Sequence, residues 1–494
     1  MAISTAVGRV LDQGGHRDPA KGLPEWKKSI NSHSAFTHDS IDSLGYDWER
    51  ISNPGITPNY PLKVYLPQTT EDIVTAVKEV KALGQKLAVR AAGHSSNDLV
   101  LSRNGGPVLL TAKLDDILAV DEQNLTATVQ GGAVSANIDD ALAQKGLGLP
   151  VIGDHNHVTV GGFASVGGIS PASHRFGMFV DNVVSLEYVN WDGEVVRCSR
   201  EDKPDHFFRV LGGLGREGVI ATLTVRIIRV DKYSTVLENR QRHFRNVNAF
   251  IKAAGAKLRE PGEALYERGV WVDLPLKSGR TLRFGQFSAY HATEQTPYKA
   301  KRDRLAYNAL HGLGYVAGRL PRKLDRTLKT VGQVGVIFSP KYATSKNVEF
   351  FADKILDSTV GEPSRMFIIL APLDHFDELF RRGYELMLDY RRRFGCFSVV
   401  SAYVKSIRSD YLAAGTGRNQ FSELLFFTGI TEKMGPELLD EIATKLDDLT
   451  IEYGGFRYMH TRTSRDPERL KKIDPSQQYL AVSAGKTMGA ADEP

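Results

Sequence analysis

Two glycine-rich segments of the sequence contain residues that could bind or react with a ligand. The first, RAAGHSSND at 90–98, follows a predicted strand and combines small residues with a histidine, and the second, DHNHVTVGGFASVGGI at 154–169, begins with an aspartate and contains four glycines. Small residues allow a ligand to approach the backbone, and consecutive N–H groups can converge on an anion. The segments could therefore grip the two ends of a dinucleotide, with a diphosphate at the first. A plain strand-to-loop turn explains the first segment equally well.

A third glycine cluster, GGLGREG at 212–218, contains GxGxxG at Gly213, Gly215 and Gly218. A Rossmann pyrophosphate loop needs a strand before it and a helix after it. Here the helix-like HFFRVL precedes the cluster, and VIATLTVRIIRV, rich in β-branched residues, predicts a strand after it. The order is inverted, so we exclude NAD binding through this loop.

The elements around the first loop form a β-α-β pattern followed by β-rich meanders. PLKVYLP at 61–67 predicts a strand, and the next helix is capped by Thr69 or Thr70, has an apolar stripe that extends to Leu83, and ends at Gly84. Further predicted strands are 86–90, 107–112, 117–121 and 125–132, and a helix is predicted at 138–146.

The middle of the chain, from about 235 to 453, has longer strands that alternate with amphipathic helices. This pattern predicts an α+β unit whose helices pack on one face of a sheet. The last forty residues predict neither a clean helix nor a domain, and we expect them to dock onto an earlier part. The predicted strands are 281–291, 366–373, 396–404 and 423–430, and the predicted helices are 375–395 and 435–455.

Composition excludes several classes of protein. A chain of 494 residues is too long for one ordinary core, and 41% hydrophobic with 24% charged residues is typical of soluble globular proteins. The net charge of +5 is too small to indicate nucleic-acid binding, and two cysteines cannot build a disulfide framework. No stretch approaches about eighteen consecutive apolar residues, and the N-terminus lacks a secretion signal, so we expect a cytoplasmic protein without a transmembrane helix.

The segment 296–330 is strongly basic, with nine Lys and Arg residues against Asp303 and Asp325. Such a run is typical of a solvated helical face. It could instead provide a weak membrane-surface contact or an anionic-ligand site.

The glycine loops, the strand–turn–strand SLEYVNWDGEVVRCS and the segment VLGGLGREGVIATLTVRI together resemble the FAD-binding domain of the vanillyl-alcohol oxidase (PCMH-type) flavoproteins, and within these most closely cytokinin dehydrogenase. The resemblance covers about residues 60–230. It implies an α+β fold with a PCMH-type domain of two α/β subdomains that binds FAD without a Rossmann fold, and a separate α+β substrate cap. We therefore predict an FAD domain at 1–235 with an N-terminal extension at 1–58, a cap at 236–453, and a segment at 454–494 that returns to the FAD domain.

The resemblance also implies which residues hold FAD. His94 stands where the family carries a histidine bonded to the flavin 8α-methyl group; the alternative is a loop histidine that only hydrogen-bonds. We expect a single covalent link, because the segment that supplies a second, cysteinyl link in some relatives reads GDHNHV here, and Cys198 is expected to be a packed thiol. The predicted cofactor-binding residues are Arg90, Ala91, Ala92, Gly93, His94, Ser95, Ser96, Asp154, Thr159, Gly161, Gly162, Ser165, Gly168, Ile169, Val219 and Ile220.

Loss of a hydride from a substrate is coupled to loss of a proton, which a carboxylate or histidine can accept. The cytokinin dehydrogenase-like pattern places an active-site aspartate at Asp154, as base or amine anchor; the alternative is a carboxylate that caps a turn. His157 is a second candidate acid/base, and we predict no metal site. Near the C-terminus, Tyr458, His460 and Arg462 would share one face of a strand, and His460 is a third catalytic candidate, although core packing or surface exposure also explains it.

These expectations together predict an FAD-linked oxidase or dehydrogenase. It would oxidise a C–N or C–OH bond of a small molecule by hydride transfer to flavin N5, with molecular oxygen or another electron acceptor. A role in specialised metabolism would fit. GHS is followed by Ser96-Asn97-Asp98-Leu99 rather than a Gly–Gln pair, which is closer to sugar, alditol and lactone oxidases and keeps that alternative open. A further alternative is a peripheral membrane or partner-docking flavoprotein that uses the basic segment.

Overall fold

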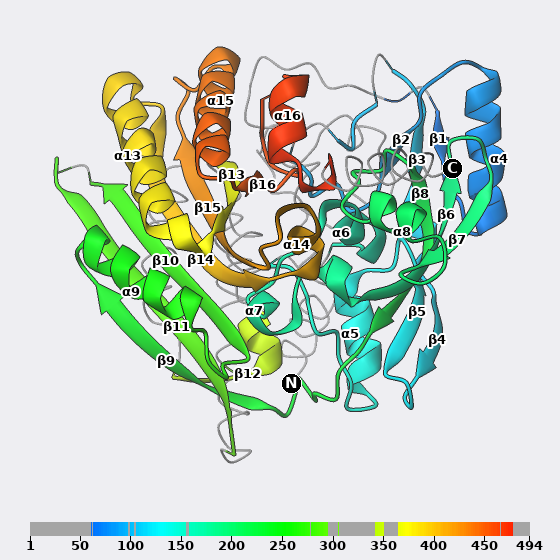
Figure 1. The fold of residues 1–494 in the computed structure, drawn as a ribbon, viewed down its shortest axis with the longest axis horizontal. Coiled ribbons are helices and arrows are strands. Elements are labelled where there is room, and N and C mark those ends of the chain that lie inside the picture. The colour runs from blue at the N-terminus through cyan, green and yellow to red at the C-terminus, as the bar shows by residue number, and fades with distance from the viewer. Residues whose placement is uncertain are drawn as a thin grey trace, which may run out of the picture.

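The computed structural model describes residues 61, 63–96, 99–102, 105–154, 158–276, 278–294, 305, 341–349, 364–464 and 466–477. Three predicted features therefore lie outside the described residues: the N-terminal extension 1–58, His157, and the basic segment 296–330 apart from Leu305. The described chain combines helices with three sheets (Figure 1). The α+β class predicted from the sequence is confirmed.

The smallest sheet is parallel and has the strand order β1 (Val64–Tyr65), β3 (Val108–Leu110), β2 (Ala88–Arg90). Helix α4 (Thr70–Ala82) connects β1 to β2. Thr69 is its N-cap: the Thr69 hydroxyl accepts a hydrogen bond from the Asp72 backbone N–H, and the Asp72 carboxylate accepts one from the Thr69 N–H. The predicted apolar stripe is wrong at Leu83, which is 60% exposed because it is the C-cap residue beyond the last turn.

The second sheet has five antiparallel strands and the order β4 (Ile117–Asp121), β5 (Thr126–Gln130), β8 (Gly218–Arg226), β6 (Val183–Asn190), β7 (Val195–Ser199). One face packs on α4 and the other belongs to a larger hydrophobic core. The GxGxxG cluster joins α8 (Pro204–Val210) to β8, so a helix precedes it and a strand follows it, as predicted. Helices α5 (Ser135–Ala143), α6 (Val160–Val166) and α7 (Ser173–Phe176) complete this half of the chain.

The third sheet has eight antiparallel strands, seen at the left and centre of Figure 1. Helices α9 (Val247–Arg259), α13 (Phe376–Phe394) and α15 (Pro436–Glu452) pack on one of its faces and share a hydrophobic core with it. Because side chains alternate between the two faces of a strand, every second residue points to the face that is not covered by these helices. The strand order is β12 (Tyr342–Thr344), β9 (Val236–Phe244), β11 (Thr281–Thr293), β10 (Tyr266–Pro275), β14 (Phe397–Arg408), β15 (Gln420–Ile430), β13 (Ser364–Pro372), β16 (Phe456–Arg457).

The C-terminal segment contacts both halves of the described chain. Strand β16 pairs with β13, while the Ser96 backbone N–H donates to the His460 carbonyl oxygen at 2.8 Å. The prediction that this segment has no clean helix is wrong, because Asp466 caps a short helix, α16 (Pro467–Ile473), with Pro467 in its first turn. A further short helix, α14 (Asp410–Thr416), and 3-10 turns at Thr111–Lys113, Phe179–Asn182 and Leu373–His375 complete the described elements. Among these helices none is long and apolar enough to cross a membrane.

Candidate cofactor and substrate site

A cavity of about 400 Å³ lies where the glycine-rich loops meet the eight-stranded sheet. Its volume is within the range of small-molecule and cofactor sites. One wall comes from residues between 87 and 220, and the other from strands β10, β11, β13, β14 and β15. Tyr458 and His460 of the C-terminal segment also line it. The cavity is therefore built from parts of the chain that are far apart in sequence.

The first glycine loop forms one edge of the cavity immediately after β2. Gly93 has a φ of +70°, and a Cβ on it would lie 2.5 Å from Arg90 Nη2, so the Arg90 guanidinium packs directly against this glycine. Arg90 is buried but does not line the cavity. The loop residues that do line the cavity are Ala91, Ala92, Gly93, His94 and Ser95.

Ser96 has a different place from its predicted neighbours. Its backbone N–H and its hydroxyl both donate to the His460 carbonyl oxygen, at 2.8 and 2.7 Å. It is buried and is not among the lining residues. Ser96 therefore ties the first loop to the C-terminal segment.

The second glycine segment forms α6 and the turn after it. The Thr159 hydroxyl caps the helix by accepting from the Gly162 N–H at 3.3 Å. A Cβ on Gly161 would lie 2.6 Å from the Gly131 carbonyl oxygen, whereas one on Gly162 would meet only Thr159 Oγ1 at 3.1 Å and Ala91 Cβ at 3.7 Å. Gly161 thus allows α6 to pack on the residue after β5, and Gly162 faces the first loop. The predicted residues of this segment that line the cavity are Thr159, Gly161, Gly162, Ser165 and Ile169.

Gly168 was predicted to contact the cofactor but does not line the cavity. Its φ is +77°, and its N–H donates to the Tyr458 hydroxyl at 3.0 Å. It therefore orients Tyr458, which lines the cavity in its place.

Strand β8 and the turn before it close the glycine-lined side of the cavity. Val219 and Ile220 line it, together with Leu214, Gly215 and Gly218 of the cluster excluded as a Rossmann loop. Sequence reasoning missed this contribution because it tested the cluster only for a phosphate-binding role.

Buried polar atoms on the glycine-lined wall can still form hydrogen bonds. Ser95 Oγ and Thr111 Oγ1 are buried and have no hydrogen-bond partner within the part of the chain that the structure describes. Both residues line the cavity. Buried hydroxyls are normally hydrogen-bonded, so this wall fits a polar ligand with several oxygen atoms, such as a diphosphate and its ribose.

A cluster of three charged side chains joins the sheet wall to the loop before α6. The Lys405 ammonium group, 3% exposed, forms hydrogen-bonded ion pairs with Asp154 Oδ2 and Glu423 Oε2. Burial alone would lower the pKa of Lys405, but the charges of Asp154 and Glu423 outweigh it and raise that pKa. Burial also raises the pKa of Glu423, against the opposing effect of Lys405. Lys405 is therefore a cation held between two carboxylates.

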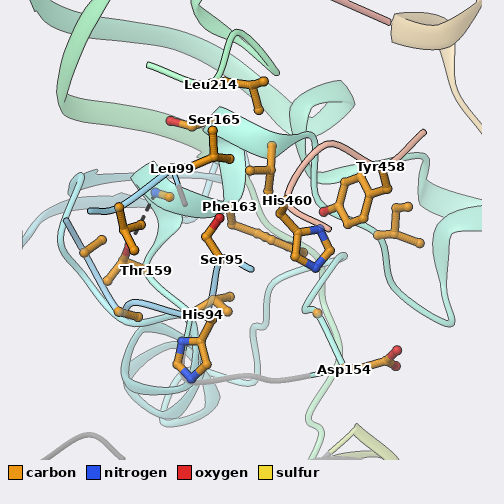
Figure 2. Close-up of a pocket in the computed structure, with 18 of the residues that line it drawn as sticks. His94, Ser95, Leu99, Asp154, Thr159, Phe163, Ser165, Leu214, Tyr458 and His460 are labelled. Carbon is orange, nitrogen blue, oxygen red and sulfur yellow. Dashed lines mark hydrogen bonds between the residues drawn. The ribbon is translucent and has the colours of Figure 1, made fainter. Parts of the chain in front are cut away.

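His460 lies beside this cluster and stacks edge-to-face on Tyr458, with ring centroids 4.4 Å apart (Figure 2). Its Nδ1 is buried and has no hydrogen-bond partner among the described residues. Burial, with a smaller effect from the Lys405 charge, lowers the pKa of His460 to about 3. The imidazole is consequently neutral near pH 7 and can accept a hydrogen bond, but it resists protonation.

The three predicted side chains His94, Asp154 and His460 line the same cavity. In Figure 2 the His94 imidazole and the Asp154 carboxylate lie on opposite sides of the view, and the His460 ring lies above them. Arg462 does not join them, because it pairs with Asp440 and strand β16 already ends at Arg457. The expectation that Tyr458, His460 and Arg462 share one strand face is therefore wrong.

The sheet wall changes from charged to apolar along its strands. At one end, the cross-strand pairs Arg268–Ser288 and Lys405–Glu423 line the cavity beside Asp154. Two residues further along each strand the lining row consists of Gln286, Val270, Tyr403, Leu425 and Ile368. The last row consists of the cross-strand pair Met366–Phe427. A ligand on this wall meets charged groups at one end and apolar side chains at the other.

Sequence reasoning missed all of these wall residues. Strands β11, β13, β14 and β15 were predicted in part, but β10 was not. Lys405 follows the predicted strand 396–404 and Glu423 begins the predicted strand 423–430, and neither was predicted as a site residue. Charged residues are almost never fully buried unless they are paired, so a charged residue at the end of a predicted apolar strand was an available signal.

His174 and Cys198 are both buried and lie outside the cavity lining. His174 is buried, and its Nε2 lies 2.8 Å from the Ala264 carbonyl oxygen. Cys198 is a free, buried thiol whose pKa is raised by burial to about 12, which confirms the prediction of a packed residue. Among the described residues no group of three or more side chains could hold a metal ion.

Comparisons with known proteins agree with this geometry over the first part of the chain. Residues 61–199 match the family described as FAD binding domain. An uncharacterized oxidoreductase of the fasciation locus of Rhodococcoides fascians is 35% identical over 167 residues, which is 34% of this chain and 37% of that protein. Cytokinin dehydrogenase 2 of Arabidopsis thaliana is 32% identical over 39% of this chain and 38% of its own length, and cytokinin dehydrogenase 8 of Oryza sativa is 31% identical over 33% and 34%. The matched part therefore spans little more than a third of these curated relatives, and it places an FAD binding domain related to those of oxidoreductases within this chain.

Proposed function

We propose that the chain is an FAD-dependent oxidoreductase that removes hydrogen from a C–N or C–OH bond of a small molecule. The observation that carries this proposal is that one cavity joins the glycine-lined wall of the FAD binding domain to the charged cluster at Asp154. When bound, the flavin would supply the hydride acceptor, and molecular oxygen or another acceptor would then take up the electrons.

The residues that would hold FAD are those of the glycine-lined wall. Hydroxyls of Ser95 and Thr159 and the N–H groups of the adjoining turns suit the diphosphate and ribose, and His94 is the proposed site of a covalent bond to the flavin. The other proposed contacts in this wall are Ala91, Ala92, Gly93, Gly161, Gly162, Ser165, Ile169, Val219 and Ile220.

Asp154 is the proposed proton acceptor. Its side chain is 28% exposed, while its Lys405 and Glu423 neighbours are 3% and 4% exposed, so it is the member of the cluster most open to a substrate. A positioned carboxylate can accept the proton of a substrate O–H or N–H as the C–H bond breaks. His460, neutral beside the cluster, could hold the substrate by accepting a hydrogen bond.

The gradient along the sheet wall supports a substrate whose reacting polar group lies against Asp154 and whose body is apolar. Met366, Ile368, Leu425 and Phe427 would cover that body. The alternative, a sugar, alditol or lactone oxidase, is favoured by Arg268, Ser288 and Gln286, which offer hydrogen bonds to several hydroxyls. Membrane or partner docking through 296–330 stays a prediction, because that segment lies outside the described residues apart from Leu305.

Anaerobic bleaching of the bound flavin at 450 nm tests the proposal. We expect benzylamine or benzyl alcohol to bleach the protein faster than xylitol or glucose, and Asp154→Asn to slow bleaching about 10²- to 10⁴-fold, the usual contribution of a general base. Asp192→Asn, at an exposed residue that pairs with Lys81, is the control and should keep the wild-type rate. Faster bleaching by xylitol would select the sugar-oxidase alternative, and an unchanged rate in Asp154→Asn would reject Asp154 as the base.

A further inference from the structure

We propose that Lys405 is a positioning residue for Asp154, and that Glu423 is the second carboxylate that keeps the Lys405 ammonium paired when Asp154 becomes protonated. This inference deepens the proposed function and rests on it, because it takes Asp154 as the proton acceptor. It concerns side chains of the eight-stranded sheet, outside the 61–199 region that matches the FAD binding domain family.

The geometry connects two parts of the chain through one ammonium group. Lys405 on β14 lies directly across from Glu423 on β15, and its Nζ contacts carboxylate oxygens of both Glu423 and Asp154. Asp154 belongs to the loop before α6, 251 positions earlier in the sequence. A side chain fixed in a sheet therefore holds a carboxylate that is carried by a loop.

Charge balance explains why the cluster has two carboxylates. With both ionised, the cluster of Asp154, Lys405 and Glu423 carries a net charge of −1. When the proton of a substrate O–H or N–H moves to the Asp154 carboxylate, the cluster becomes neutral and the Lys405–Glu423 pair remains intact. Without Glu423 the same transfer would leave a buried ammonium group without a counter-charge, which is strongly unfavourable.

The groups around Lys405 support this assignment. The two carboxylates hold Lys405 in its charged form in spite of burial, and the Lys405 charge acts in turn on His460. Arg268 and Tyr403 of the same wall interact electrostatically with Asp154, as Tyr458 does with Asp154 and Glu423. Among the described residues, the titratable and charged groups that face the cluster are thus Arg268, Tyr403, Tyr458 and His460.

The first test needs no substrate. Crystal structures of the FAD-loaded wild type, Lys405→Met and Lys405→Arg would show the position of the Asp154 carboxylate. We expect it to leave the position beside β14 in Lys405→Met and to stay there in Lys405→Arg, which retains a cation. An Asp154 carboxylate in its wild-type position in Lys405→Met would overturn the inference. If the Met variant does not fold, Lys405→Gln takes its place with the same expected outcomes.

The second test separates positioning from a general structural effect by a double-mutant cycle. The probe is whichever compound of the benzylamine, benzyl alcohol, xylitol and glucose panel bleaches the wild type fastest, and the measured quantity is the limiting bleaching rate. We expect Lys405→Met to lower the limiting bleaching rate at least tenfold, and Lys405→Arg to keep most of the wild-type rate. The double variant Asp154→Asn with Lys405→Met should have the same rate as Asp154→Asn alone, within about twofold. If the loss of rate in the double variant equals the product of the two single losses, Lys405 does not act through Asp154.

A matched control exists in the same chain. Lys232 is 1% exposed and lies between Asp139 and Glu349, with Nζ to carboxylate oxygen distances of 3.0 and 2.8 Å, but it does not line the cavity. Lys232→Met should lower the Tm as Lys405→Met does and leave the bleaching rate unchanged. A similar rate loss in both variants would make the effect one of stability and overturn the inference. If no panel compound bleaches any form, the proposed function fails, while the crystallographic comparison still decides the role of Lys405.

Discussion

His460 shows how much the chemistry of one residue depends on its surroundings. The sequence predicted it as a catalytic candidate with core packing as the alternative, and the structure places it in the cavity wall with a buried Nδ1 beside the Lys405 ammonium group. Both burial and the neighbouring cation disfavour a second positive charge. The folded protein therefore holds this imidazole in its neutral form.

This neutral state predicts a pH dependence of stability. The folded pKa of His460 is about 3, below the ordinary value of 6.5, so the unfolded chain takes up the proton first as the pH falls. The neutral His460 therefore contributes to the free energy of unfolding fully above pH 6.5. This contribution is lost progressively below pH 6.5, by about 2 kcal/mol between pH 7 and 5. Urea unfolding of the wild type and of His460→Phe should show a difference in unfolding free energy that shrinks by this amount as the pH falls. A difference that stays constant across this range would contradict the assignment.

Among individual residues, the sequence predicted the site residues that stand in the glycine-rich segments. It missed those whose role depends on tertiary contacts. His94, Asp154 and Thr159 were found because they stand in recognisable segments, and all three line the cavity. Lys405 and Glu423 could not be assigned in the same way, because the partner of Lys405 at Asp154 is 251 positions away. Spacing along a chain carries no information about such a pair.

At the scale of elements, helix α6 determines the shape of the glycine-lined wall. Gly161 allows the helix to pack on Gly131, and Gly162 leaves open the space between Thr159 and Ala91. The backbone of Gly162 has an ordinary helical conformation, since its φ is not in the left-handed region. A larger side chain there would enter the cavity without straining the backbone.

Gly162→Leu is therefore expected to prevent FAD binding while the fold persists. Leucine is also a better helix former than glycine by about 1 kcal/mol, so the Tm of the flavin-free protein should not fall. The FAD content of the purified variant, measured as the ratio of absorbance at 450 and 280 nm, should drop at least tenfold. Gly435→Leu, at a half-buried glycine with no atom within 4 Å of the added Cβ, is the control and should keep its flavin. A yellow Gly162→Leu protein with normal FAD content would place the cofactor elsewhere.

Helices and strands were more predictable than site residues, because hydrophobic periodicity and helix capping depend on residues that are close together in the sequence. The helix-then-strand order around GxGxxG and the amphipathic helices α13 and α15 follow from such signals. Local signals failed at chain ends and element ends, as at Leu83 and in the C-terminal segment with α16. There the outcome depends on what the segment packs against.

At the scale of the whole molecule, the cavity exists only because distant parts of the chain meet. The buried ion pairs of Lys232 with Asp139 and Glu349, and the Tyr266 hydroxyl that donates to Glu349 at 2.8 Å, join α5, residues 345–349 and β10. The C-terminal segment adds the contacts of Ser96 with His460 and of Gly168 with Tyr458. The division into FAD domain, cap and returning segment stays a prediction. The contacts of Ser96 and Gly168 with the C-terminal segment are what would hold such parts around the cavity, whereas the Lys232 ion pairs lie away from its lining.

Acid precipitation of the purified protein tests the central claim that this cavity holds FAD beside His94. We expect a yellow pellet for the wild type, because the proposed bond to His94 would carry the flavin into the precipitate. For His94→Ala we expect a colourless pellet with flavin in the supernatant. Flavin in the supernatant of the wild type would contradict the covalent bond. A wild-type protein that carries no flavin, and takes up none when FAD is added, would show that the cavity is not an FAD site.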